Sequence, residues 1–205
     1  TKILGAVNVP GRHMRQNVMN AALVLYLMGV QPDAIQKILG GWNGIPHRLQ
    51  FFHQFKSAAA RTVRFYNDSC STVPEAAAAA SAAFGKTVIF IAGGTDKGLD
   101  FEPLAEALDP TIVSSSPAAA LYLLAGSGTD KLLPLLQARK IAFNGPYNSL
   151  DELLGALKKD FGDASSPAYN NDTVVFSPGC TSFGMFSNEF DRGEKFMAAV
   201  KKIFA

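Results

Sequence analysis

From Arg48 to the carboxyl terminus, short apolar segments of strand length alternate with longer segments of helical periodicity. A strand followed by a helix returns to the same sheet by a crossover, which favours parallel pairing with helices on both faces. We therefore predict an α/β fold with a Rossmann-like, mainly parallel sheet. The expected strands are 49–55, 62–66, 87–92, 111–114, 141–143 and 173–176, and the expected helices are 74–84, 102–108, 117–124, 131–137, 150–161 and 189–204.

The first 44 residues follow a different pattern. A strand-like segment at 2–9 precedes helical segments at 13–28 and 32–39, and turn residues between 40 and 46 separate these from the α/β pattern. We place a domain boundary here, with residues 1–44 as a small helical remnant of a preceding domain and residues 45–205 as the Rossmann-like domain. Because the chain begins in an apolar run without a methionine, we expect a fragment of a longer protein.

Composition narrows the class of protein. Hydrophobic residues make up 48% of the chain, enough for a substantial core, and the formal charge of +2 is scattered without a basic stripe, so we expect no nucleic-acid partner. No apolar run reaches the roughly 18–20 residues of a membrane span, and no leader peptide is recognisable. Two cysteines are too few for a disulfide framework or a zinc site. We expect a soluble, cytoplasmic protein, and a monomer.

Three loops that follow predicted strands carry the polar residues of interest. They are 67–72, 93–98 and 177–183, and all are rich in small and hydrogen-bonding residues. In an open parallel sheet, ligands bind beyond the carboxyl ends of the strands. These loops are therefore the predicted binding site.

The segment 80–87 reads A-x-x-x-x-G-K-T, one glycine short of a phosphate-binding P-loop. A P-loop follows a strand and opens a helix, whereas Gly85 and Lys86 close a predicted helix and precede a strand. We interpret Gly85 as a helix C-cap instead. Since no other segment of the sequence fits the pattern, we do not expect this chain alone to bind nucleoside triphosphates tightly.

Thr72, Lys97 and Ser182 lie in the three loops, and each has a structural as well as a functional interpretation. Thr72 opens the capping box T-V-P-E, and a helix N-terminus also attracts a carboxylate. Lys97 follows two glycines that permit close approach of a ligand, although such a lysine is more often simply solvated. Ser182 can donate to the same anion or cap a turn.

Three histidines and an arginine lie in or near the proposed domain boundary and its flanking helix. His13 and Asn17 are one turn apart and share a helix face, in a binding, capping or core role. His47 and Arg48 lie at the proposed hinge, where the arginine can reach a phosphate when domains close, or remain an ordinary surface residue. We interpret His53 as structural. No catalytic triad or carboxylate pair stands out.

Taken in order, five segments resemble motifs of the Mur ligase family, most closely of its glutamate-adding members. The likeness covers essentially the whole chain, and although each motif alone is weak, five in order are specific. The segments are Gly11-Arg12-His13 with Asn17 and Ala21, Gly44-Ile45-Pro46-His47-Arg48, Asn67-Asp68-Ser69 with Thr72, Gly93-Gly94-Thr95-Asp96-Lys97 with Asp100-Phe101, and Ser177-Pro178-Gly179-Cys180 with Ser182-Phe183, Phe186, Asn188 and Arg192-Gly193.

This resemblance implies the end of the family's central ATP-binding domain followed by its complete C-terminal, amino-acid-binding domain. It implies an ATP-dependent ligase that adds D-glutamate to UDP-N-acetylmuramoyl-L-alanine in peptidoglycan synthesis, by way of an acyl phosphate. ATP and Mg²⁺ are the implied cofactors, and the implied partners are the small-molecule substrates. The P-loop and magnesium ligands are expected upstream, so the chain alone is expected to be inactive.

The resemblance also implies roles for individual residues. Lys97 and Arg48 are implied to act in catalysis, and no metal ligand is expected in this chain. The implied ATP-binding residues are His13, Asn17, His47, Arg48 and Asp68, and the implied amino-acid-binding residues are Thr72, Lys97, Ser182 and Phe183.

Three positions depart from the family pattern: Met14 replaces an asparagine, Cys70 replaces a lysine, and Glu189-Phe190 reverses the family order. Loss of the lysine removes a cation near the glutamate and phosphate region, so the choice between D-glutamate, L-glutamate and another amino acid stays open. The alternatives are a related ligase for another amino acid, such as a folylpolyglutamate- or cyanophycin-type enzyme, and a non-catalytic Rossmann-like binding module.

Overall fold

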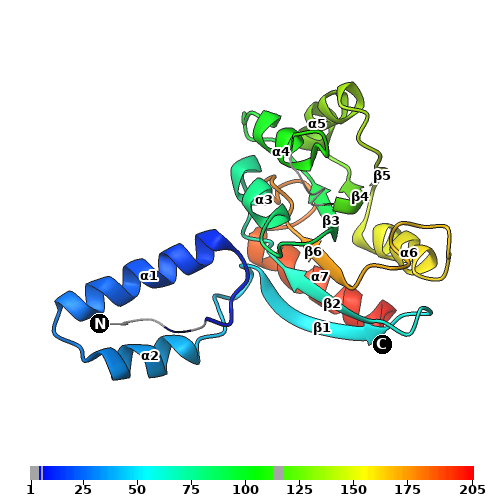
Figure 1. Ribbon diagram of the computed structural model, residues 1–205. Coiled ribbons are helices and arrows are strands. Elements are labelled where there is room, and N and C mark those ends of the chain that lie inside the picture. The colour runs from blue at the N-terminus through cyan, green and yellow to red at the C-terminus, as the bar shows by residue number, and fades with distance from the viewer. Residues whose placement is uncertain (1–4, 6, 113–117) are drawn as a thin grey trace.

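A computed structural model describes residues 5, 7–112 and 118–205. Within them, a six-stranded sheet has the order β1-β2-β6-β3-β4-β5 (Figure 1). β1 and β2 pair antiparallel and the other neighbours pair parallel, which confirms the predicted mainly parallel sheet. The strands are β1 (Gln50–Lys56), β2 (Thr62–Asn67), β3 (Val88–Gly93), β4 (Ala118–Leu124), β5 (Asn144–Tyr147) and β6 (Thr173–Phe176).

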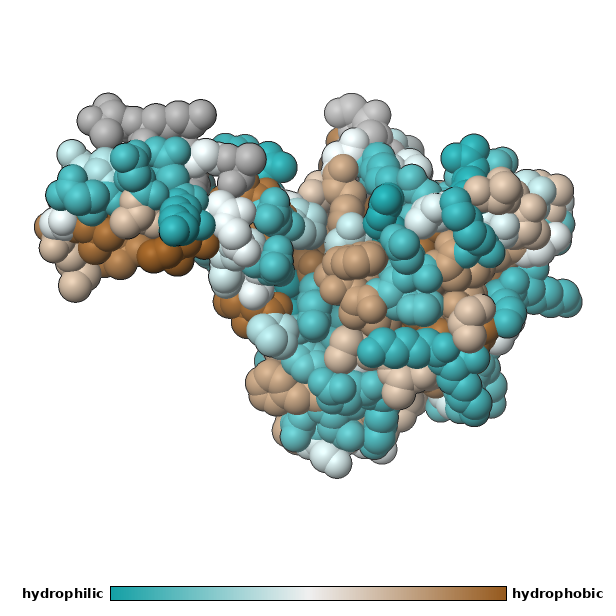
Figure 2. Space-filling model, turned by 90° about the horizontal axis from the view of Figure 1, so that it is seen from below, coloured by the Kyte–Doolittle hydropathy of each residue, from teal (hydrophilic) through white to brown (hydrophobic). Residues whose placement is uncertain are grey.

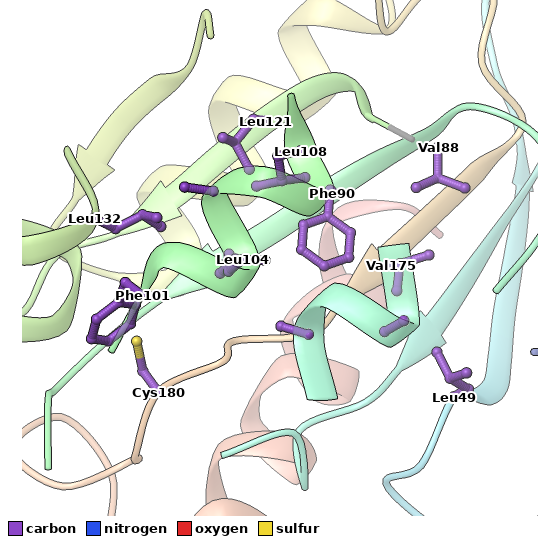
Figure 3. Packing of buried hydrophobic residues seen from close by; sticks show 14 of the residues in the cluster. Leu49, Val88, Phe90, Phe101, Leu104, Leu108, Leu121, Leu132, Val175 and Cys180 are labelled. Carbon is purple, nitrogen blue, oxygen red and sulfur yellow. The ribbon is translucent and has the colours of Figure 1, made fainter. Parts of the chain in front are cut away.

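Different helices cover the two faces of the sheet. Phe90 and Val175 point into the core on one face, which Figure 3 shows, while Ile91 and Phe176 belong to the core on the other. Successive strand residues alternate between faces, so a strand buried on both needs an uninterrupted apolar run. The first face carries α3 (Pro74–Ser81), α4 (Glu102–Leu108) and α5 (Ser127–Ala138), and the second carries α6 (Leu150–Asp160) and α7 (Glu189–Ile203).

The first two helices, α1 (Arg12–Leu27) and α2 (Pro32–Gly40), form an arm that extends away from the sheet (Figure 1). Both were predicted to within one residue at each end. Apolar side chains are exposed on the arm, as Figure 2 shows, and Leu27 and Met28 are each 75% exposed. The division into domains at residue 44 stays a prediction. Within the described residues, no helix combines the length and apolar character that crossing a bilayer requires.

The predicted helix at 117–124 is wrong, because residues 118–124 form β4. Alanine and leucine favour helices, which is why this segment suggested one. In the fold the segment lies between β3 and β5, and residues 120–124 are all buried. A short, continuous apolar run also fits a buried parallel strand, and pairing on both sides outweighs the intrinsic preference.

The predicted strands at 2–9 and 111–114 lie partly outside the described residues. Thr111 and Ile112 form a turn after α4, and residues 7–9 belong to no strand. The strand predicted at 141–143 is also wrong in position, since β5 begins at Asn144. Ile141 and Phe143 pack against the core from the connection that precedes it, which explains the apolar pattern.

Gly85 and His53 were both given structural roles from the sequence. α3 ends at Ser81, so Gly85, with a φ of 64°, lies in the connection to β3 and is not the helix C-cap that we predicted. The segment does follow a helix and precede a strand, which was the reason for rejecting a P-loop. His53 has the structural role that we predicted, with Nε2 2.9 Å from the carbonyl oxygen of Phe204.

Candidate functional site

The carboxyl ends of β2, β6 and β3 are neighbours in the sheet, and the loops that follow them meet. The amide of Gly179 donates to the carbonyl of Ser71 at 3.0 Å, which joins the loop 177–183 to the loop 67–72. The amide of Thr181 donates to the carbonyl of Thr95 at 3.0 Å, which joins it to the loop 93–98. The three loops predicted from the sequence therefore lie together at one edge of the sheet.

Arg192 of α7 holds two of these loops together. Its side chain is 1% exposed, and Nε donates to Ser69 Oγ at 3.0 Å. Nη2 donates to the carbonyl of Ser69 at 2.7 Å and Nη1 to the carbonyl of Cys180 at 2.9 Å. Burial lowers the pKa of the guanidinium to about 10, so it stays charged at neutral pH. A fixed cation therefore lies beneath the loops.

Close packing explains why a glycine, Gly193, follows Arg192. A Cβ at Gly193 would lie 2.2 Å from Nδ1 of His47 and 2.9 Å from Nδ2 of Asn67. Only a residue without a side chain lets α7 approach the hinge this closely. Arg192 and Gly193 belong to the last of the five motifs, but an arginine and a glycine at the start of a helix are too weak a signal to predict either role.

The N-terminus of α3 is open toward the site. The capping box predicted at Thr72 is wrong, because α3 begins at Pro74 with Val73 as N-cap, and no side chain caps it. The half-buried Thr72 is thus not used by the helix. The hydroxyl of Ser71 is buried and has no hydrogen-bond partner among the described residues. The amide of Glu75 in the first turn of α3, together with the unpaired buried hydroxyl of Ser71, can donate to an anion.

Ser182 and Phe183 line a shallow cleft with Gly94 and Arg192. Ser182 is 4% exposed and Phe183 is 64% exposed, so one faces inward and the other is available as a flat surface. Thr95 Oγ1 donates to the carbonyl of Phe183 and fixes that loop to the one after β3.

Lys97 lies two residues beyond Thr95 and is exposed. Its neighbour Asp96 is engaged elsewhere, because it pairs with Lys131 and accepts from the amides of Gly98 and Leu99 at 2.9 Å each. In the described part of the chain, Lys97 forms no ion pair. It is therefore a cation available to an incoming anion at the rim of the site.

Arg48 and Asp68 form the second group of predicted residues. Nη1 of Arg48 lies 3.4 Å from Oδ1 of Asp68, which is 2% exposed. Asp68 also accepts from the amide of Leu49 at 3.1 Å and from the hydroxyl of Ser177 at 2.7 Å. The carboxylate therefore holds residues 48 and 49 at the end of β2 and orients the arginine, whose side chain is 28% exposed.

The remaining predicted residues are His13, Asn17 and His47. His13 lies near Arg48. Burial lowers the pKa of His13, and the charge of Arg48 lowers it further. Asn17 is exposed on the next turn of α1. His47 is buried and turned toward α7, with Nδ1 2.9 Å from Nδ2 of Asn67 and Nε2 3.4 Å from Oε1 of Glu194. Its contacts attach the hinge to α7.

A further cleft, of about 640 Å³, lies between the segment that precedes α1 and the outer strands β1 and β2. None of the predicted site residues lines it. No three histidine, cysteine, aspartate or glutamate side chains come together for a metal ion in the ranges that the structure describes.

The departures from the family pattern change the charge of the site. Cys70 is half-buried in the loop after β2, and burial first, then the charge of Glu189, raises the pKa of its thiol. The thiol is therefore neutral at pH 7. The site has a neutral group where the family pattern has a lysine, and the carboxylate of Glu189 lies nearby.

Burial raises the pKa of Asp68 from 3.8 to about 6, although Arg48 and hydrogen bonds act in the opposite direction. The folded protein therefore binds this proton more tightly than the unfolded chain does. Proton binding stabilises the folded state fully below about pH 4, and this stabilisation is lost as the pH rises through about 6. Relative to Asp68→Asn, the wild-type free energy of unfolding should fall by about 2.4 kcal/mol between pH 4 and pH 7. Urea denaturation of both proteins across this range measures it, and parallel pH profiles would contradict it.

No family model matches. The chain is 45% identical over 170 residues to the UDP-N-acetylmuramoylalanine--D-glutamate ligase of Treponema pallidum, which covers 83% of this chain and 28% of that protein. It is 34% identical over 197 residues to the ligase of the same name from Roseiflexus sp., covering 95% of this chain and 38% of that protein. The chain thus spans well under half the length of these relatives.

Two solved structures share the fold. MurF from Acinetobacter baumannii matches with a TM-score of 0.61 and 17% identity, over 94% of this chain and 38% of that one. Mycobacterium tuberculosis folylpolyglutamate synthase complexed with ADP matches with a TM-score of 0.57 and 14% identity, over 94% of this chain and 41% of that one. The fold is that of an α/β domain of the Mur ligase type. The chain belongs to the Mur ligase family, and the curated relatives that it matches carry the name of the D-glutamate-adding ligase.

Proposed function

We propose that the chain is the amino-acid-binding part of an ATP-dependent UDP-N-acetylmuramoylalanine--D-glutamate ligase, a soluble, monomeric, cytoplasmic enzyme of peptidoglycan synthesis. One structural observation carries the proposal. The uncapped N-terminus of α3, with Ser71 and Thr72, adjoins the loops that hold Ser182 and Lys97. Glutamate brings two carboxylates, and this arrangement offers two places for an anion.

In this proposal the chain fixes the position of glutamate. One carboxylate binds at the N-terminus of α3 with the hydroxyl of Thr72, and the other binds between Lys97 and Ser182. Arg192 contributes positive potential from below. The amine is then held for attack on the carboxyl group of UDP-N-acetylmuramoyl-L-alanine, and a fixed approach removes much of the entropic cost of bringing two reactants together.

Arg48 is the residue of this chain that fits a nucleotide phosphate, because it is partly exposed and Asp68 orients it. ATP, when bound, supplies the phosphoryl group that activates the carboxyl group as an acyl phosphate. His13 and Asn17 would flank the nucleotide from α1, and His47 would hold the hinge behind it. We place the P-loop and the Mg²⁺ ligands in an upstream part of a longer protein, so the chain alone should be inactive.

A chimera tests this function. This chain would replace the matching segment of the Treponema pallidum ligase, and phosphate release from ATP would be measured with UDP-N-acetylmuramoyl-L-alanine and D-glutamate, L-glutamate or no amino acid. We expect release that depends on D-glutamate. Release only with L-glutamate or another amino acid would support ligase activity with a different amino-acid specificity. We would attribute that difference in specificity to the Cys70 and Glu189 positions.

Binding to the chain itself provides a second measurement. Amide resonances of the loops 67–72 and 177–183 should shift when D-glutamate is titrated into the isolated chain. No shift with any amino acid, together with no phosphate release by a folded chimera, would favour the non-catalytic binding module.

A further inference from the structure

A groove between α6 and α7 lies outside the candidate site. Its volume is about 400 Å³, which is within the usual range of small-molecule pockets, roughly 300–1,000 Å³. Ala198 and Ala199 line it from α7, where their short side chains leave space, and Leu150, Met185 and Phe186 add apolar surface. The groove can therefore bury an apolar body.

The α7 side of this groove carries two cations. Lys195 and Lys202 both line it, two helical turns apart on one face. Nζ of Lys195 lies 2.8 Å from Asp191 and 5.8 Å from the centre of the Phe186 ring, whereas Lys202 forms no ion pair within the part of the chain that the structure describes. Asp151 lines the α6 side, in the first turn of that helix, where the helix dipole offsets its charge.

We propose that this groove binds a small amphipathic anion, with its apolar body against the alanines and its carboxylate, sulfonate or phosphate group on the lysines of α7. Met185 and Phe186 line both this groove and the cleft that contains Ser182. An occupant therefore contacts the loop that carries Ser182, and the inference holds whatever amino acid that cleft takes.

The probe is 8-anilino-1-naphthalenesulfonate, an aromatic sulfonate that fluoresces in apolar surroundings. Titration of the intact chain should give saturable fluorescence with a defined Kd. Lys202→Gln should raise this Kd at least threefold, and Ala198→Trp, which fills the groove from an exposed position, should remove the saturable component. Lys201→Gln is the matched control, because Lys201 is equally exposed on the same helix but does not line the groove.

The variants separate this groove from other apolar surfaces, such as that of the arm. Equal Kd values for Lys201→Gln and Lys202→Gln would overturn the recognition of the anionic group. Unchanged binding by Ala198→Trp would place the dye elsewhere and overturn the site itself. Circular dichroism verifies the fold of each variant, and Ala198→Leu fills the groove less severely if the tryptophan variant does not fold.

Discussion

Replacing Arg192 by methionine should lower the free energy of unfolding by about 3 kcal/mol or more, because the variant loses three charge-assisted hydrogen bonds in the interior. The carbonyl oxygens of Ser69 and Cys180 would remain buried without these donors. Methionine keeps much of the volume, so the loss reports hydrogen bonding more than packing. Urea denaturation followed by circular dichroism measures the effect.

The control for this experiment is Arg64→Met, which removes an exposed arginine from β2 and should change the free energy of unfolding by no more than about 0.5 kcal/mol. Arg192→Lys keeps the charge but offers one nitrogen in place of three, so it should recover only part of the loss. Equal stabilities of Arg192→Met and Arg64→Met would mean that the network does not hold the two loops. Loosened loops should also weaken glutamate binding.

The course of the sheet could be predicted where the pattern was unambiguous. Val88 to Ala92 reads as a strand because five consecutive apolar residues fit a parallel strand that is buried on both faces. The run 118–124 is buried from residue 120 onward but is rich in alanine and leucine, so local preference and tertiary pairing disagree there. The segment becomes the strand β4, and not a helix, because it lies between two neighbouring strands. The local sequence does not contain that information.

The candidate site was predictable in its loops but not in its contacts. Strand order places the ends of β2, β6 and β3 together, and the rule for ligand sites in parallel sheets led to all three loops. The role of Arg192 could not be predicted, because its partners are 123 and 12 residues away in the sequence. Thr72 was misread as a helix cap because Val73, one residue later, takes that position.

Arg48 and the loop 67–72 are linked through the end of the same strand, β2. Asp68 orients Arg48 from the end of β2, and Ser69, the next residue, is held by Arg192. Two adjacent residues therefore connect Arg48 to the loop that carries Thr72. In the proposed enzyme, this connection would bring the nucleotide and glutamate sites into register when the domains close.

Lys97→Ala should raise the Kd for D-glutamate roughly 10- to 100-fold, because a charged hydrogen bond to a carboxylate contributes about 1.5–3 kcal/mol. Lys97 forms no ion pair in the described residues, so its removal leaves no partner within the protein uncompensated and the fold should be unaffected. In the chimera, KM for D-glutamate should rise with kcat little changed if the contact is equally strong in the ground and transition states.

The matched control is Lys201→Ala, an exposed lysine near the carboxyl end of α7 that lies in none of the three loops. Its Kd for D-glutamate should equal that of the wild type. Lys97→Arg keeps the charge and should restore most of the affinity, which separates the loss of a cation from a change in loop conformation. A wild-type Kd for Lys97→Ala would remove Lys97 from the glutamate site and leave the N-terminus of α3 and Ser182 as the anion-binding groups.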